Sequence, residues 1–196
     1  MNMAESHTDE LEREKLSKEA SSMTHALLRD SIDMLMQEAY DGPPDPQSTW
    51  FVNNDSDGGV LGTVRHLTAL QAWFKPEGLA HSVAEHVAHI LFSLNHASKC
   101  AACGERVDAD WGRSWDVGQV DEARWQSLQR QLKESQLRMR MWVHADESFT
   151  SKESIALLVG AIAHTAYHLG AIRQIAALAV RETPADDPVA EMARPL

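Results

Sequence analysis

The sequence contains four long segments in which apolar residues recur at helical spacing, and none with the apolar–polar alternation of a β-strand. In the first segment Leu28, Ile32, Leu35 and Ala39 fall three or four residues apart, on one side of a helix. Such a helix has to bury its apolar side, and the pattern offers only other helices as partners. An all-α fold, a four-helix up-down bundle, is therefore predicted. Its helices are expected at residues 18–40, at 82–98, from 121 to at least 139, and at 150–181.

The chain of 196 residues, 43% of them apolar, suits a single domain with a core of ordinary size. We place the bundle at residues 19–182, between a polar N-terminal extension (1–18) and a C-terminal tail (183–196). A long connection joins the first two main helices over residues 41–80. It opens with "DGPPDPQ", which no helix can cross, and a shorter helical stretch is expected in "GTVRHLTALQAWF".

Two of the predicted helices carry the spacing of a capping box at their start. Ser82 is followed three residues later by Glu85, and Thr150 by Glu153. In this motif the two side chains satisfy backbone N–H groups of the first turn. Both pairs are therefore expected to mark helix N-termini.

The charge balance narrows the range of partners. The chain has 29 acidic and 18 basic residues, a net charge of -11, and its most basic stretch, "RQLKESQLRMR", is interrupted by Glu134. Binding to nucleic acid or to an anionic membrane needs clustered cations, so neither partner is expected. The N-terminal stretch lacks the apolar region of a signal peptide. Cys100 and Cys103 form a single CxxC without a second pair, which indicates incidental thiols and a cytoplasmic, reducing location.

The fourth predicted helix is apolar enough to be compared with a membrane span. From Ile155 to Val180 the run is longer than the ~20 residues that cross a bilayer. Two histidines and Arg173 lie in its middle, however, and a charge at membrane depth costs at least ~2.5 kcal/mol. We therefore expect the most buried helix of a soluble bundle.

This helix carries His164 and His168, four residues apart in "HTAYH". Residues i and i+4 project from the same face of a helix, so two imidazoles at this spacing can bind one metal ion. The glutamate that follows the first histidine in HExxH metalloproteases is absent, which excludes that class. The spacing alone leaves open that both are core histidines. Two buried imidazoles without hydrogen-bond partners would destabilise the fold, and coordination of one metal ion would satisfy both rings.

A third histidine makes a metal site more specific. His89 lies in the middle of the predicted helix 82–98, flanked by apolar residues in "AEHVAHILF". Catalytic zinc sites commonly have three protein ligands and one open position, and histidines from two facing helices would meet that description. His86, one turn away, is the alternative ligand. A lone core histidine bonded to a carbonyl remains the other interpretation of His89.

At these residues the sequence resembles the DinB/YfiT-like family of four-helix-bundle metalloproteins. "SVAEHVAHILFSL" is similar to its second-helix motif, with Ser82 and His89 at the fixed places. "HTAYHLGAIRQI" is similar to its last-helix motif, with His164 and His168 at the other two ligand positions. The resemblance extends over about residues 20–182 and rests on two separate motifs in the right order.

The resemblance implies a divalent metal, usually zinc or nickel, held by three histidines with solvent completing the shell. It also implies homodimers and a small-molecule substrate. Activities in the family include S-transfer with low-molecular-weight thiols, related isomerisations and metal-dependent hydrolysis. Residues 38–44 and the "WGRSW" segment 111–115 are weaker similarities. The chain departs from the family at Ala171, where glutamine is frequent.

Several functions follow from these observations. The first is a metal-dependent enzyme, a thiol-dependent S-transferase or a hydrolase. A metal-activated water needs a base, and the only nearby candidate, Glu85, is expected to cap its helix. A thiol bound as thiolate needs none, which favours S-transfer. The alternatives are a non-catalytic dimeric metal-binding or stress-response protein, and a bundle in which the histidines only pack.

Overall fold

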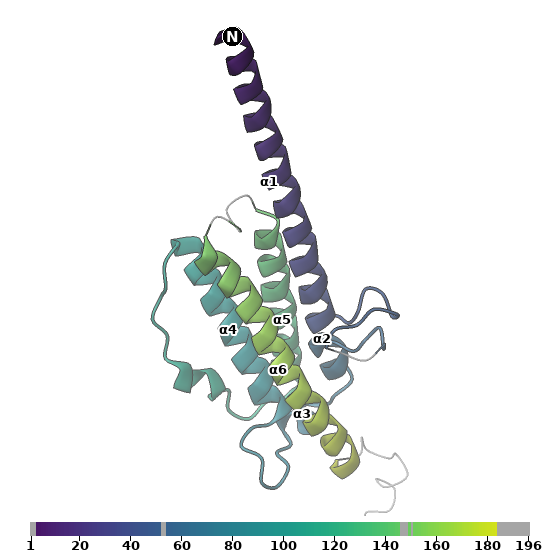
Figure 1. The fold of residues 1–196 in the computed structure, drawn as a ribbon. Coiled ribbons are helices and arrows are strands. Elements are labelled where there is room, and N and C mark those ends of the chain that lie inside the picture. The colour runs from purple at the N-terminus through teal and green to yellow at the C-terminus, as the bar shows by residue number, and fades with distance from the viewer. Residues whose placement is uncertain (1–2, 52–53, 146–148, 150, 184–196) are drawn as a thin grey trace, which may run out of the picture.

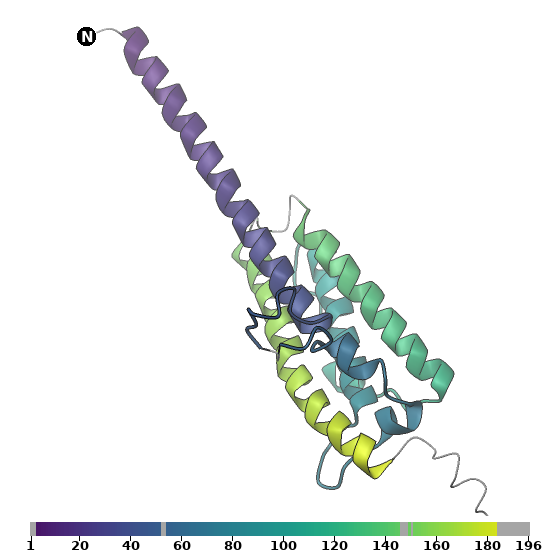
Figure 2. The same cartoon turned by 90° about the vertical axis from the view of Figure 1, so that its right-hand side faces the viewer.

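A computed structural model describes residues 3–51, 54–145, 149 and 151–183, with side chains from residue 12 onward. Within these ranges the chain forms helices and no strand, so the predicted all-α class is confirmed. Four long helices lie side by side (Figures 1 and 2). They are α1 (Met3–Tyr40), α4 (Val83–Cys103), α5 (Glu122–Val143) and α6 (Lys152–Glu182); the shorter α2 (Val60–Val64), α3 (Ala69–Trp73) and 3-10 helix η1 (Trp111–Trp115) lie in the connections.

The direction of the helices differs from the predicted up-down order. α4 and α5 run the same way, whereas α1 and α6 run the opposite way (Figures 1 and 2). The N-terminal ends of α4 and α5 both bind the segment around α3: Glu122 accepts the backbone N–H of Ala69 at 3.0 Å, and Glu85 pairs with Lys75 at 3.0 Å. The connection that carries η1 is long enough to return along the bundle, which is why α5 can start at the same end as α4.

The first helix begins much earlier than predicted. The core pattern placed its start near Lys18, whereas α1 runs from Met3 and projects beyond the bundle (Figures 1 and 2). The side chains of residues 12–27 are all exposed, so this part of the helix has no core stripe to reveal it in the sequence. Packing against the core begins at Leu28, and Ile32 is buried as predicted.

The helix caps agree with the sequence at α4 and differ at α6. Ser82 and Glu85 form the predicted capping box, in which each side chain accepts the other residue's backbone N–H. The predicted cap Thr150 lies outside the described residues. The N-cap of α6 is Ser151, whose hydroxyl accepts the N–H of Ser154. Serine caps a helix as well as threonine does, so the start of α6 moves by one residue.

Two interhelical hydrogen bonds hold the helices that carry the histidines. The hydroxyls of Tyr40 on α1 and Thr165 on α6 are 2.7 Å apart and buried. On the other side of the bundle the Ser135 hydroxyl of α5 donates to Asn95 Oδ1 of α4 at 2.8 Å. Such bonds fix the rotation of each helix, because a small shift would leave the buried hydroxyls of Tyr40 and Ser135 unpaired.

α6 is long and apolar enough to span a membrane by length and composition, the one helix of the described residues that is. One side of it packs against α1 and α4 and includes Leu158, Leu169 and Ile172. Only 39% of its most apolar window is buried, however, and Val159 and Tyr167 face outward. It is therefore a core helix on one side only, and less buried than the sequence led us to expect.

Candidate metal centre

The three histidines predicted as ligands meet between α4 and α6. The Nε2 atom of His164 lies 3.0 Å from Nε2 of His89 and 3.1 Å from Nε2 of His168. One ring nitrogen of each residue lies within 4.8 Å of the other two, so this group could hold a metal ion. His89 and His168 are buried, 7% and 5% exposed, and His164 is half-buried.

The spacing of these nitrogens fits one shared cation. Two imidazole nitrogens bound to a tetrahedral zinc ion at 2.0–2.1 Å are roughly 3.3 Å apart. The two contacts that His164 makes are a few tenths of an ångström shorter than this. The donor set, three neutral nitrogens, suits zinc, nickel, copper or iron.

Ser114 fixes which nitrogen of His89 carries the proton. The serine hydroxyl donates to the backbone carbonyl of Trp111 at 2.5 Å, so its only proton is already used. Its contact of 2.6 Å with His89 Nδ1 therefore has the imidazole N–H as donor. A neutral imidazole carries one proton, so Nε2 of His89 presents a lone pair to the cluster. Metal-binding histidines are typically held in this way by a partner on the other nitrogen.

His86 is the partner of His168 and not a member of the cluster. Their Nδ1 atoms are 3.0 Å apart, so one of the two nitrogens donates to the other. If His168 is the donor, its Nε2 atom also presents a lone pair, as coordination requires. The alternative of His86 as the third ligand is not what the geometry shows: His89 occupies that place, and His86 lies behind His168.

A proton count shows that the cluster is unsatisfied without a cation. Nε2 of His89 carries no proton. A single proton on Nε2 of His164 can form a full hydrogen bond to Nε2 of His89 or to Nε2 of His168, but not to both. If the proton is on Nδ1 of His164 instead, it has no partner, because this atom is buried without a hydrogen bond. Either arrangement leaves polar atoms unpaired in the interior. A divalent cation would satisfy all three Nε2 atoms at once.

The WGRSW segment, η1, covers the histidines. The ring of Trp115 stacks on that of His89 with centroids 3.9 Å apart and on that of His81 at the same distance. Its edge contacts His86 and His168 at 5.3 and 5.6 Å. In the sequence this segment shows only a weak family similarity. The two tryptophans of the segment, with Ser114 between them, were the signal that the sequence offered. They did not indicate contact with His89.

The surroundings of the cluster keep the histidines neutral. Burial, followed by the neighbouring histidines, lowers the pKa of His89 to about 4 and that of His168 to about 3. Burial also lowers the pKa of His164, and burial with the nearby His81 lowers the pKa of His86 to about 4. Neutral imidazoles are the form that binds metal, so little competition from protons is expected near pH 7.

Other residues of interest lie outside the cluster. Glu85 is engaged by its capping box and by Lys75, which removes it as a base for a water. Cys100 and Cys103 are free thiols in the last turn of α4, and Cys100 Sγ contacts His96 Nε2 at 3.6 Å. They do not contribute to the histidine group.

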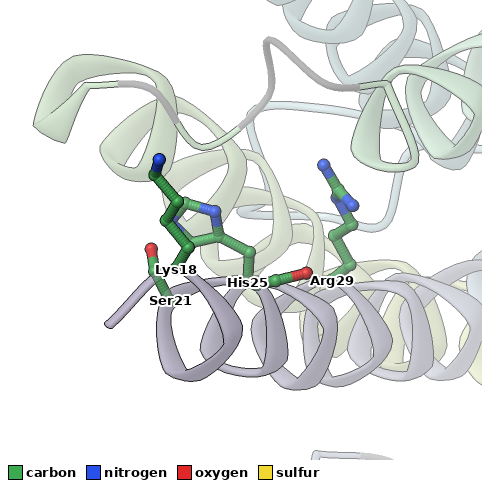
Figure 3. A pocket seen from close by; sticks show the side chains of 5 residues that line it. Lys18, Ser21, His25 and Arg29 are labelled. Atoms are coloured by element: carbon green, nitrogen blue, oxygen red, sulfur yellow. The ribbon is translucent and has the colours of Figure 1, made fainter. Parts of the chain in front are cut away.

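Two of the hollows on the described surface differ in their relation to the cluster. One, of about 240 Å³, adjoins the cluster through His86 and is lined mainly by apolar side chains, with His81 and Gln174. The other, of about 380 Å³, lies beside α1 and is lined by Lys18, Ser21, Ser22, His25 and Arg29 (Figure 3). It contains none of the cluster histidines and does not belong to the centre.

Comparison with protein-family models, with curated proteins and with solved structures gives no significant match. A proposal for the function of the chain therefore rests on the geometry of its own residues. The DinB/YfiT-like resemblance stays an expectation from two motifs.

Proposed function

We propose that the chain is a DinB-like metalloprotein that binds one divalent cation, zinc or nickel, through His89, His164 and His168. The observation that carries the proposal is the convergence of three Nε2 atoms, one of them fixed as a lone pair by Ser114. The four long helices and the separation of the ligands between α4 and α6 support it. The resemblance of the two histidine motifs points to the same residues.

The chemistry we propose is thiol-dependent S-transfer on a small-molecule substrate. A cation held by three histidines lowers the pKa of a thiol or water in its open position. Among the described residues no carboxylate makes a hydrogen bond to the cluster, and the nearest candidate, Glu85, is engaged elsewhere. A thiol that binds as thiolate requires no such base, whereas hydrolysis does. The protein's own part is to hold the three imidazoles neutral and oriented.

The hollow beside His86 supports a substrate with an apolar part. Its lining of Leu79, Ala80, Ala171 and Ile175 is apolar and it adjoins the centre. Binding pockets are typically of this kind, apolar with a few polar groups that fix orientation. His81, His86 and Gln174 are the polar residues that line it.

A non-catalytic metal protein is the second candidate, favoured by the burial of the centre. His89 and His168 are almost fully buried, and Trp115 covers His89 with its ring. Structural metal sites are closed and stabilise the fold directly. In that case removal of the metal would lower the melting temperature strongly, and no thiol would react.

Elemental analysis of untagged protein, purified without added metal, is the first test. We expect close to one equivalent of zinc or nickel, and less than about a tenth of an equivalent would contradict both candidates. The metal-loaded protein is then mixed with monochlorobimane and one thiol at a time, among them cysteine, glutathione and coenzyme A. Conjugation that is lost in His164→Ala supports S-transfer. Full metal content without conjugation supports the non-catalytic protein.

A further inference from the structure

α1 carries a second apolar stripe that the bundle does not use. Leu16, Met23 and Leu27 are 65%, 64% and 63% exposed, and Met34 is 39% exposed. With 100° per residue, these side chains lie on one side of the helix, roughly 130° away from the core-facing stripe that includes Ile32. A polar helix surface does not need four large apolar residues in line.

The spacing of this stripe is that of a coiled-coil seam. The steps along the stripe alternate between four and three residues, through Leu16, Ala20, Met23 and Leu27. One further seam position, residue 30, lies between Leu27 and Met34. The seam belongs to a helix that stands alone, since residues 12–27 are exposed throughout. Isolated helices of this length are marginal in water. The ion pairs of Lys18 with Glu14 and of Lys15 with Glu19 are exposed and add little.

Two charged residues also occupy seam positions and indicate the partner of the seam. Arg13 precedes Leu16 at the next seam position, and Asp30 fills the position between Leu27 and Met34. Both are exposed, and neither makes an ion pair within the described part of the chain. A parallel pair of identical helices would place Arg13 against Arg13 and Asp30 against Asp30. An antiparallel pair places Arg13 against Asp30, twice, by two-fold symmetry.

We propose that two copies of this chain pair through an antiparallel coiled coil of their α1 helices. Leu16 lies opposite Leu27 of the partner subunit, Ala20 opposite the partner's Met23, and Arg13 opposite the partner's Asp30. This single register pairs every seam residue from 13 to 30 with an apolar or oppositely charged one. It is independent of the metal centre, because none of these residues contacts the histidines.

The flanks of the seam are compatible with this register. Glu19 lies beside the partner's Ala26, and Ser17 beside the partner's Thr24, so these positions bring no like charges together. Glu12 lies beside the partner's Asp33, but the carboxylate of Asp33 already accepts hydrogen bonds from Nε and Nη2 of Arg140, at 2.6 and 2.8 Å. The polar side of α1 that carries Lys18 and His25 (Figure 3) faces away from the seam.

Sedimentation of the full-length chain over a range of concentrations tests the pairing. We expect a species of twice the 21.8 kDa of one chain. Leu16→Glu combined with Met23→Glu places charges in the seam, and should weaken dimerisation at least ~100-fold. Met141→Glu, at a 75% exposed methionine of α5, is the matched control and should leave the dimer unchanged. All these side chains are exposed, so the bundle should keep its melting temperature.

A charge exchange tests the register. Arg13→Asp alone and Asp30→Arg alone each create two like-charge contacts and should weaken the dimer roughly three- to tenfold. The double variant, Arg13→Asp with Asp30→Arg, should regain most of the affinity. A monomer at every concentration, a dimer that ignores the seam variants, or a double variant that adds the two losses would each overturn the proposal. A monomer that binds anionic vesicles or another protein through α1 would do the same.

Discussion

The Nδ1 atom of His89 and the hydroxyl oxygen of Ser114 are 2.6 Å apart, although they come from α4 and from the separate segment η1. Because Ser114 donates its proton to Trp111, the imidazole must donate to Ser114. One hydrogen bond thus decides that His89 turns a lone pair toward His164 and His168. The metal affinity of the cluster should depend on a residue that cannot touch the metal.

Ser114→Ala is expected to weaken metal binding by about 10- to 100-fold, as is typical when the partner of a ligand histidine is removed. The reason is that the ring loses the acceptor that holds its tautomer and orientation. Competition with a chromophoric chelator measures the affinity. Ser98→Ala is the control, since Ser98 lies on α4 and its hydroxyl donates only to the Leu94 carbonyl. Equal affinities for the two variants would contradict the role of Ser114.

His86 and the three cluster histidines should respond differently to substitution. Alanine at His89, His164 or His168 removes a ligand, and should abolish stoichiometric metal. His86→Asn leaves the ligand set intact and should retain the metal with an affinity about 10- to 100-fold lower, because only the partner of His168 changes. Elemental analysis and chelator competition give both quantities. If the His86→Asn protein binds no metal, His86 is itself a ligand, and one of the three cluster histidines is instead the hydrogen-bond partner of a ligand.

Trp115 should report the state of the cluster through its fluorescence. Its ring stacks on His89 at 3.9 Å, so a cation on that histidine changes the environment of the indole. We expect metal addition to the metal-free protein to change the emission intensity, and Trp115→Phe to remove most of that change. Trp50→Phe is the control, because Trp50 is 70% exposed and makes no ring contact with a cluster histidine. A metal response that survives Trp115→Phe would place the reporter elsewhere.

The sequence predicts the helices best where they carry a core stripe. Ile32 and the capping pair of Ser82 with Glu85 lie where the pattern placed them. The pattern fails for the start of α1, which runs from Met3, since the exposed residues 12–27 carry no apolar stripe that faces the core. It also fails for the direction of α5, because the length of a connection does not say at which end the next helix starts.

The same limit applies to the centre. His164 and His168 share one helix, so their spacing alone brings the side chains together. Contact with His89 depends on how α4 slides along α6, which core packing decides and only a motif resemblance could suggest. Ser114 and Trp115 belong to a segment without periodicity, and their contacts with the histidines arise from the tertiary fold alone.

The ion pair between Asp33 and Arg140 should make stability depend on pH. The hydrogen bonds from Arg140, which joins α5 to α1, hold the pKa of Asp33 below its ordinary value even though burial opposes them, and the nearby His144 adds to the effect. A lowered carboxyl pKa stabilises the folded state at pH values above the unfolded pKa of about 3.9. This contribution is lost as the pH falls through the folded pKa.

Asp33→Asn should therefore lower the melting temperature by about 2–4 °C at pH 7, which corresponds to about 1 kcal/mol for a chain of this size. The difference from the unchanged protein should persist down to about pH 5, begin to shrink near pH 4, where the Asp33 carboxyl of the unfolded chain becomes protonated, and disappear as the pH falls through the lowered pKa of the folded state. Thermal unfolding followed by circular dichroism at several pH values measures it. Glu134→Gln, an exposed position of α5 outside any ion pair of the described residues, is the control. A difference that stays constant down to pH 2 would show that the cost comes from lost packing and not from the charge.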